Sequence, residues 1–448
     1  MTVVTGERAA AASQVAAGML APVSEATFTD QAVLPLNLAS LRRYADFAAE
    51  LESTTGLPAG LRQAPTLSVG YDADDAARLR AFADFLDRTG FSCERLTGRD
   101  CRSHEPLLAP AIQAGLLVAE DWSCDNRLLL RALVAAARQA RVTEVAGFVH
   151  AVLSRDGRVT GVALADGSTI AAMQIVIANG AWAAQVGGIP ALPVRPVKGQ
   201  ILRLDPGRLT GPTLTVRAFT RGSEVYLVPR DGGRELVVGA TVEELGFDHR
   251  VTAGGVYELL RDARTVLPLT AEYALTETAV GWRPGTPDNA PILGQCELGG
   301  LLLATGHYRN GVLLTPITAD VIAKLVVSHE LDPIAAGFGL DRFRTGGRGG
   351  VVPPGANTAS GGRGGVVPPR SQHSPDGCTD SMIISVNGER RELAPPVRLL
   401  DVLGLQPGEP TRGIAVAVDG IVVPRSRHAS TELADGARVE IVKAVQGG

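Results

Sequence analysis

The sequence is poor in cysteine, and none of its cysteines is spaced as in a metal-binding motif. No two of the five are separated as C-x-x-C, and their number is odd, so the sequence predicts neither a disulfide framework nor a zinc site. A reducing compartment fits this pattern. The cysteines are Cys93, Cys101, Cys124, Cys296 and Cys378.

Long apolar runs are also missing. The first 20 residues lack a basic segment followed by a continuous apolar one, so we expect no signal peptide. The most apolar long stretch, 170–192, is interrupted by Gln174, Asn179 and Gln185, which favours a core strand and helix over a membrane span. We therefore expect a cytoplasmic protein with no membrane partner.

Charge of one sign is not in excess either. The formal net charge is −4, from 43 Lys and Arg against 47 Asp and Glu. Bulk electrostatics of this kind argue against a nucleic-acid partner. The 448 residues, 45% of them hydrophobic and 4% aromatic, describe an ordinary globular chain of two or three domains.

One internal repeat divides the chain. The nonapeptide GGRGGVVPP occurs at 346–354 and again at 361–369, among further Gly, Pro, Ser and Thr residues. Such a stretch cannot bury enough apolar surface to order itself. We expect 346–381 to be a linker between a large domain, 1–345, and a small one, 382–448.

The large domain alternates strand and helix patterns. We expect an α/β fold that also carries an antiparallel sheet, because several of the strands are joined by hairpin turns. The expected strands are 2–4, 159–164, 169–178, 225–228, 235–239 and 300–305, and the expected helices are 41–51, 75–89, 124–141 and 310–329.

The small domain is short and rich in turns. Its order of strand, strand, helix and three strands in under 70 residues suggests a ubiquitin-like β-grasp fold. The chain ends at Gly447 and Gly448, a tail without Cβ atoms that can enter a narrow channel. The expected elements are strands 382–386, 389–393, 414–418, 421–423 and 438–445, with a helix at 397–405.

The small domain resembles the sulfur carrier protein of thiamine biosynthesis. The resemblance rests on the hairpin ISVNGE, the helix, AVDGIVVPR at 417–425 and the ending LADGARVEIVKAVQGG. It implies that the carboxylate of Gly448 is adenylated and then converted to a thiocarboxylate. An adenylating enzyme and a thiazole synthase would be the partners. A ubiquitin-like interaction module with an inert tail is the alternative.

The large domain is similar to glycine oxidase of the same pathway, within the D-amino-acid-oxidase family of flavoproteins. The resemblance implies an FAD-binding Rossmann-like fold with an antiparallel substrate sheet. It also implies oxidation of glycine by O2 to the imine or glyoxylate, with release of H2O2. The matching stretches are AAGMLAP at 16–22, VKGQ at 197–200, VYLVPR at 225–230, VVGAT at 237–241, GWRPGTPDNAP at 281–291 and GHYRNGVLLTP at 306–316.

This resemblance implies three substrate-binding residues. Arg283, in what reads as a turn bounded by Gly and Pro, would clamp the substrate carboxylate with two hydrogen bonds. Tyr226 would close the pocket near that carboxylate, and Arg309 would be a second cation. Without the family match, a surface arginine at a turn and a core aromatic residue remain the simpler interpretations.

The same resemblance implies the cofactor contacts. Gly311 would allow close approach of the backbone to the flavin, and Val149 would lie on the adenine side. No cysteine lies in 300–316, so we expect the FAD to be bound without a covalent link, and we expect no metal site. The expected contacts are Ala17, Gly18, Met19, Val149, His307, Tyr308, Arg309, Asn310, Gly311, Val312 and Leu313.

One family feature is missing from this sequence. No G-x-G-x-x-G precedes AAGMLAP, and 2–4 corresponds to the second strand of the dinucleotide-binding unit. Thr5 stands where the ribose-binding acid is expected, with Glu7 close by. Two explanations stay open. The start codon is assigned too far downstream, or the domain is a degenerate oxidase that serves as a scaffold for the carrier. Sarcosine or D-amino acids remain alternative substrates, and a homo-oligomer is left open.

Overall fold

The computed structural model describes the chain as two compact units, Met1–Pro353 and Pro354–Gly448. The expected linker, 346–381, and the terminal Gly448 lie outside the described residues. The structure describes residues 1–6, 11–26, 32–343 and 382–443, without 387–388, 394–396, 404–413, 419–420, 424–427, 429–430 and 434–436.

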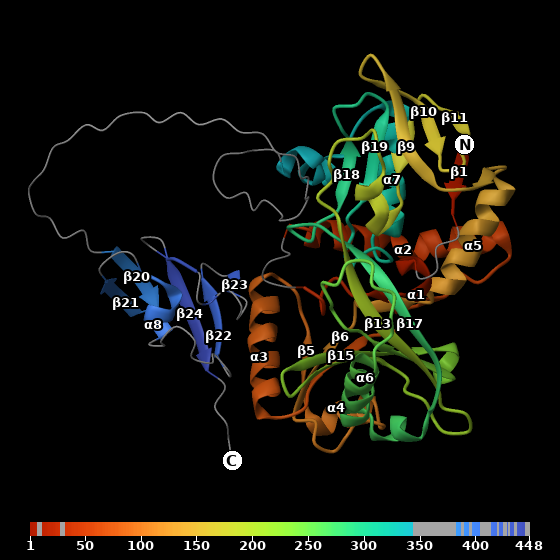
Figure 1. Cartoon of the computed structure of the whole chain (residues 1–448). Helices are drawn as coiled ribbons and strands as arrows, with labels where there is room; N and C mark the ends of the chain where they lie inside the picture. The colour runs from red at the N-terminus through yellow and green to blue at the C-terminus, as the bar shows by residue number, and fades with distance from the viewer. Residues whose placement is uncertain are drawn as a thin grey trace, which may run out of the picture. The chain divides into compact units, whose positions relative to one another are not determined.

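An eight-stranded sheet forms one lobe of the first unit (Figure 1). Its order is β17-β13-β16-β15-β14-β4-β6-β5, and all neighbours are antiparallel except β14 and β4. The expected hairpin of 225–228 with 235–239 is therefore present. The strands are β4 (Thr66–Gly70), β5 (Glu94–Thr97), β6 (Ala114–Val118), β13 (Arg195–Asp205), β14 (Thr215–Thr220), β15 (Ser223–Arg230), β16 (Glu235–Gly239) and β17 (Ala274–Gly285).

Helices cover both faces of this sheet. Successive side chains of a strand point to opposite faces. On β6, Leu117 packs with the cluster that includes Leu259 of α6 (Ala253–Val266), whereas Leu116 packs with Leu79 and Ala83 of α3 (Ala73–Arg88). The two helices thus lie on opposite faces.

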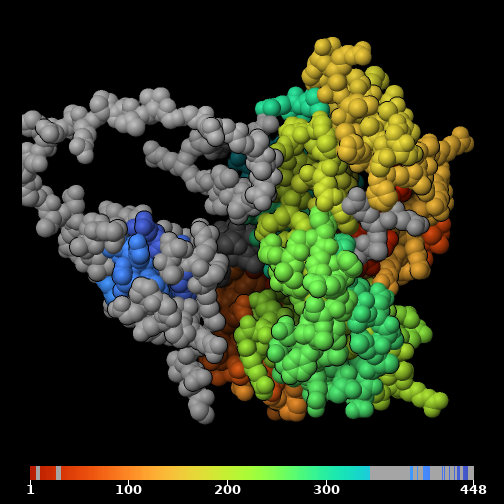
Figure 2. All heavy atoms as spheres, in the orientation of Figure 1, coloured from red at the N-terminus to blue at the C-terminus, as the bar shows by residue number. Residues whose placement is uncertain are grey.

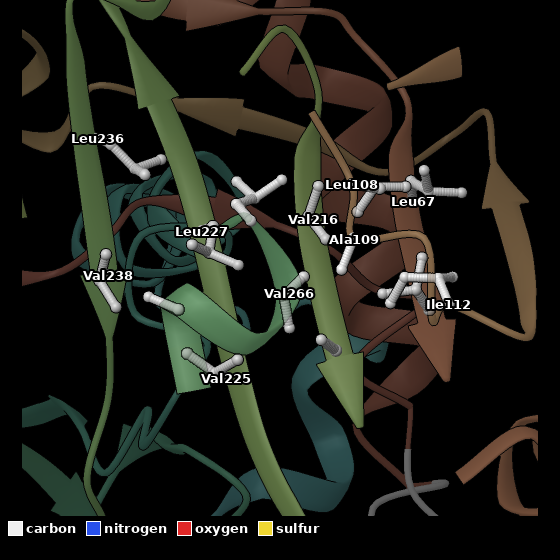
Figure 3. Close-up of a cluster of buried hydrophobic side chains, with 14 of the residues drawn as sticks. Leu67, Leu108, Ala109, Ile112, Val216, Val225, Leu227, Leu236, Val238 and Val266 are labelled. Carbon is white, nitrogen blue, oxygen red and sulfur yellow. The ribbon is translucent and has the colours of Figure 1, made fainter. Parts of the chain in front are cut away.

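The core under α6 is the largest apolar cluster of the sheet lobe. Val225 and Leu227 of β15 meet Val238 of β16 and Val266 of α6, and Leu227 and Val266 are fully buried (Figure 3). Burial of a leucine side chain of this kind is worth about 2 kcal/mol. Because β15 buries its odd-numbered residues against α6, its even-numbered residues must face the other side.

The other lobe consists of small sheets. β1 (Thr2–Thr5) pairs in parallel with β8 (Thr143–Ala146), and β12 (Ile175–Ile177) pairs in parallel with β19 (Leu301–Thr305), which also pairs with β18 (Ile292–Gln295). The expected hairpin near Asp166 is the sheet β11-β10-β9, coloured yellow at one end of the unit in Figure 2. Its strands are β9 (Val149–Arg155), β10 (Arg158–Leu164) and β11 (Thr169–Ala171).

A fourth small sheet has the order β2-β7-β3, and the first unit also contains the helices that remain. α5 begins after Asp125, whose carboxylate accepts from the N–H groups of Arg127 and Leu128, as an N-cap should. These elements are β2 (Met19–Leu20), β3 (Leu61–Arg62), β7 (Trp122–Cys124), α1 (Ala12–Val15), α2 (Leu34–Thr55), α4 (Gly98–His104), α5 (Asn126–Gln139), α7 (Thr315–Ser328) and the 3-10 segments η1 (Gly180–Gln185), η2 (Asp231–Gly233), η3 (Pro268–Glu272), η4 (Pro333–Phe338) and η5 (Leu340–Phe343).

The helix expected at 310–329 begins later than the pattern indicated. α7 starts at Thr315, with Pro316 in its first turn, where a residue without an N–H fits best. Residues 311–314 form turns instead. The carbonyl groups of Val312 and Leu313 accept hydrogen bonds from the side chains of Tyr44 and Ser40 on α2, which the sequence pattern could not reveal.

The second unit contains one five-stranded sheet in the order β21-β20-β24-β22-β23. β20 and β24 are parallel, and the other pairs are antiparallel. Its core joins Leu399 and Val402 of the helix to Ile384, Val416 and Val439. The elements are β20 (Met382–Val386), β21 (Glu389–Leu393), α8 (Leu399–Leu403), β22 (Ile414–Val418), β23 (Ile421–Val423) and β24 (Arg438–Lys443).

Within the described ranges, none of the helices has the length and apolar character needed to cross a membrane.

Candidate active site

The sheet face opposite α6 carries the side chains expected to bind substrate. Tyr226 alternates with the core residues Val225 and Leu227 of β15, and so it faces away from α6. On β17, Ala279 packs with Ile201 and Val228 on this same face. Arg283 lies four residues after Ala279 on the same strand, and so its side chain points to the same face. Tyr226 and Arg283 therefore share one face.

Arg283 lies within β17, paired opposite Val197 of β13, and not in the turn that its Gly and Pro neighbours suggested. The turn follows only after Gly285, because the long β13 continues the pairing through the Pro284 position. Its guanidinium donates to the carbonyl of Thr241 over 3.1 Å. A position within a paired strand holds the guanidinium of Arg283 more rigidly than a loop position would.

Two glycines of neighbouring strands lie beneath these side chains. A Cβ on Gly199 of β13 would be 2.6 Å from Nη1 of Arg283, and a Cβ on Gly239 of β16 would be 2.5 Å from the ring of Tyr226. Both distances are too short for a real contact. The two side chains can lie flat across the sheet only because these positions carry hydrogen.

A cavity of about 2680 Å³ opens over this face. The expected substrate residues Tyr226, Arg283 and Arg309 all line it. Asn310 does not, and Leu313 is buried in the core beside Tyr44. The expected cofactor residues that do line the cavity are Ala17, Gly18, Met19, Val149, His307, Tyr308, Arg309, Gly311 and Val312.

His307 enters the cavity wall as a neutral imidazole. Burial lowers its pKa to about 4. Its Nε2 lies 3.0 Å from the hydroxyl of Thr318 on α7. A neutral ring so held can accept or donate one hydrogen bond, but it does not add a positive charge to the site near neutral pH.

The charge of Glu25 affects the pKa of both Tyr226 and Arg309. Burial raises the pKa of Tyr226, Glu25 raises it further, and Arg283 and Arg309 oppose the shift. For Arg309, burial opposes the charge, but Tyr308 and Glu25 raise its pKa. The phenol of Tyr226 therefore remains protonated and can donate a hydrogen bond, while the guanidinium of Arg309 remains charged.

Sequence reasoning missed six charged residues of the cavity: Glu25, Arg217, Glu224, Glu258, Arg261 and Asp262. Arg217 is cross-strand partner to Tyr226, and its Nη2 lies 4.0 Å from Glu25 and 3.8 Å from Glu224. Strand alternation from Tyr226 could have indicated Glu224, two residues earlier. Glu25 follows a tight turn whose N–H groups at 23 and 24 are held by the carboxylate of Asp121, and no local pattern signals it.

The backbone conformation at position 18 explains why this residue is a glycine. Its φ is +68°, in the left-handed region, and its carbonyl accepts from the N–H of Cys124 over 2.7 Å. A Cβ there would collide with the Cys124 carbonyl. A Cβ on Gly311, by contrast, would meet nothing closer than 3.8 Å. The open approach to a ligand is therefore at Gly311, while Gly18 is required by the fold.

The cavity fits one half of a dinucleotide better than the other. The segments 17–19 and 307–312 supply backbone groups, neutral side chains and the guanidinium of Arg309 around a space for a flat ring. Among the described residues, no glycine-rich loop joins a strand to a helix to receive a pyrophosphate. The same part of the chain holds no cluster of three or more His, Cys, Asp or Glu suited to a metal.

Comparison with protein families divides the chain in the same way. Residues 1–325 match the family described as FAD dependent oxidoreductase. Residues 384–448 match the ThiS family. The two matches cover separate parts of the chain, one in each unit.

The first unit is similar to proteins of known name. A bifunctional protein ThiO/ThiG of Trichormus variabilis is 36% identical over 345 residues, which are 77% of this chain and 51% of that protein. Glycine oxidase of Geobacillus kaustophilus is 34% identical over 342 residues, 75% of this chain and 89% of that protein. The chain thus spans about half the length of the ThiO/ThiG relatives that it matches.

The solved structures agree in fold. The crystal structure of the Geobacillus kaustophilus glycine oxidase has a TM-score of 0.69 at 33% identity, covering 76% of this chain and 92% of that one. Iminodiacetate oxidase from Chelativorans sp. has a TM-score of 0.68 at 26% identity, covering 75% and 92%.

Proposed function

Because the chain belongs to the FAD-dependent oxidoreductase family and carries a C-terminal ThiS-family domain, we propose that it supplies two precursors for thiazole assembly in thiamine biosynthesis. The first unit would oxidise glycine with FAD and O2. The second would carry sulfur as a thiocarboxylate on Gly448. The relatives named ThiO/ThiG and glycine oxidase support this reading.

The pairing of Arg283 with Tyr226 carries the oxidase half of the proposal. Among the described residues, Arg283 has no carboxylate partner, and its guanidinium donates to the carbonyls of Thr241 and Lys198. A charged guanidinium with unused donors beside a protonated phenol suits a substrate carboxylate. Glycine would bind there with its α-carbon directed into the cavity.

The protein groups would bind and orient, and the cofactor would carry the redox chemistry. FAD, when bound, supplies the two-electron acceptor that O2 returns to its oxidised state with formation of H2O2. Arg283 and Tyr226 would hold the carboxylate, and neutral His307 would leave the local field unchanged. The net reaction converts glycine, O2 and water into glyoxylate, ammonia and H2O2.

Segments 17–19 and 307–312 would hold the flavin ring, and Val149 would lie toward the adenine. The described cysteines are all free thiols, and none of them lies in the segment 300–316, so the link would be non-covalent. The pyrophosphate has no glycine-rich loop among the described residues, and FAD binding is therefore the first property to measure.

The sheet order of the second unit supports the carrier half. Parallel β20 and β24 at the centre, with a helix packed on the sheet, agree with a ubiquitin-like β-grasp domain. Its tail would be adenylated by a partner enzyme and then converted to a thiocarboxylate for a thiazole synthase. The domain boundaries 1–345, 346–381 and 382–448 remain part of this proposal.

A second candidate follows from the incomplete phosphate site. The first unit could act as an inactive scaffold for a working carrier. A colourless purified protein that still accepts sulfur would favour it over the oxidase.

The test is glycine-dependent formation of H2O2 by the full chain with FAD. We expect activity with glycine, and Arg283→Lys should raise KM on the order of tenfold to a hundredfold, because a bidentate charged contact is lost. Arg264→Lys, an exposed change outside the cavity, is the control. Failure to oxidise glycine, sarcosine or any D-amino acid would refute the oxidase half.

A further inference from the structure

Two hydroxyl groups of α2 reach the segment that precedes α7. The phenol of Tyr44 donates to the carbonyl of Val312 over 2.9 Å, and the hydroxyl of Ser40 donates to the carbonyl of Leu313 over 2.6 Å. Both side chains are fully buried. They lie one helical turn apart, and so they point from the same face of α2.

These bonds fix which way the peptide groups of the segment face. The C=O and N–H of a planar trans peptide point in opposite directions. With the Val312 carbonyl held by Tyr44, the N–H of Leu313 points away from α2. The carbonyl of Gly311 is also occupied, by the hydroxyl of Thr315 over 3.1 Å. Gly311 and Val312 line the cavity, and the carbonyl groups of residues 311–313 are all engaged by hydroxyl groups, which leaves the N–H groups of Val312 and Leu313 to meet a ligand.

The two hydroxyls stand where apolar side chains would be expected. The surrounding cluster consists of residues such as Leu20, Leu41 and Leu129. A hydroxyl in such a core is costly unless it is hydrogen-bonded. Burial raises the pKa of Tyr44 strongly, so its phenol remains a donor throughout the physiological range. Two core positions, Tyr44 and Ser40, therefore carry hydroxyl groups that orient the segment 311–313.

We propose that Tyr44 and Ser40 are positioning residues that hold residues 311–313 with their amides toward the cavity. Such a row of N–H groups favours the electron-rich edge of a ligand. Resting on the proposed function, that ligand is the flavin of FAD. Neither residue touches the cavity, and both act through the backbone of Val312 and Leu313.

Hydrogen exchange of the full chain, read by mass spectrometry, tests the proposal without any cofactor. The N–H of Thr315 donates to the same Val312 carbonyl over 3.2 Å, and the N–H of Leu314 donates to Asn310 over 2.8 Å. In Tyr44→Phe and Ser40→Ala, these amides should exchange about fivefold faster, the factor that corresponds to one lost hydrogen bond.

A matched control is available in the sheet lobe. The phenol of Tyr273 also donates to a backbone carbonyl, that of Thr210, from a buried position. Tyr273→Phe should leave the exchange of residues 307–318 unchanged. Equal exchange in this segment for wild type, Tyr44→Phe and Ser40→Ala would overturn the proposal.

Titration with FAD supplies the second readout. Both variants should bind FAD about fivefold more weakly than wild type, whereas Tyr273→Phe should bind it equally. Unchanged affinity in both variants would overturn the proposal. If the wild-type chain binds no FAD, the proposed oxidase function fails, and the exchange measurement alone decides whether the two hydroxyls position the segment.

Discussion

Gly199 of β13 lies directly beneath the guanidinium of Arg283 on β17, and a Cβ at that glycine would be 2.6 Å from Nη1. The two residues belong to the most extensively paired strands of the sheet. Arg283 keeps its place by donating to Thr241, on the other side of β13. The hydrogen atom at Gly199 is therefore a condition for the orientation of Arg283.

Gly199→Ala should displace this guanidinium. We expect kcat/KM for glycine to fall on the order of a hundredfold, because small misplacements of a binding group have effects of this size. FAD affinity should stay unchanged. Gly254→Ala, where a Cβ meets nothing within 4 Å, is the control. Equal kinetics for the two variants would show that Arg283 does not depend on Gly199.

His307 should make the stability of the first unit depend on pH. Its pKa falls from 6.5 to about 4 on folding, so the unfolded chain binds the proton more readily between these values. Stability contributed in this way is present above pH 6.5 and is lost as the pH falls toward 4. In His307→Asn, urea midpoints should vary less over this range. The exposed His104→Asn is the control, and an unaltered slope in His307→Asn would contradict the assignment.

Glu25 should restrict the site to substrates with one carboxylate. Its charge faces Arg217, raises the pKa of Arg309 and would repel a second carboxylate. In Glu25→Gln we expect the ratio of kcat/KM for iminodiacetate to that for glycine to rise about tenfold, which corresponds to 1.4 kcal/mol. Glu272→Gln, an exposed change outside the cavity, should leave the ratio as it is. If Glu25→Gln leaves this ratio of kcat/KM values unchanged, Glu25 does not select the substrate.

The two proposed activities should be separable at the C-terminus. Deleting Gly448 should abolish formation of the thiocarboxylate by an activating enzyme, ATP and a sulfur donor, because the reacting carboxylate would then belong to a different residue. Intact-mass spectrometry measures the exchange of one oxygen for sulfur. Glycine-dependent H2O2 should stay at the wild-type level. Loss of both activities would mean that the two units depend on each other.

Much of the fold was predictable because it follows from local pattern. The helix starting after Asp125 follows from a capping side chain and an amphipathic repeat, and the hairpin of β15 and β16 follows from a turn between two apolar runs. The start of α7 was misplaced by five residues, because the apolar run from Val312 to Leu314 continues the helical pattern. The bonds from Ser40 and Tyr44 hold this run in turns instead.

The site itself was only partly predictable. Motifs indicated Tyr226 and Arg283, but the apparent turn around Arg283 proved to be a strand, because β13 is long enough to pair with it. Glu25 was missed because its position depends on Asp121, a fully buried carboxylate distant in sequence, and on no repeat of its own. Glu224 could have been predicted, because it precedes Tyr226 by two residues on the same strand.

The sequence by itself determined the family, several of the strands and helices, and the separation of an oxidoreductase-like unit from a carrier-like one, because periodicity, turn chemistry and motifs are local properties. Only the tertiary structure decided that Gly199 makes room for Arg283, that Glu25 shares a cavity with Arg309, and that Tyr44 holds the backbone of Val312. These relationships join strands and helices that are far apart in the chain. Their physical reason is the packing of whole elements, which no local stretch of residues encodes.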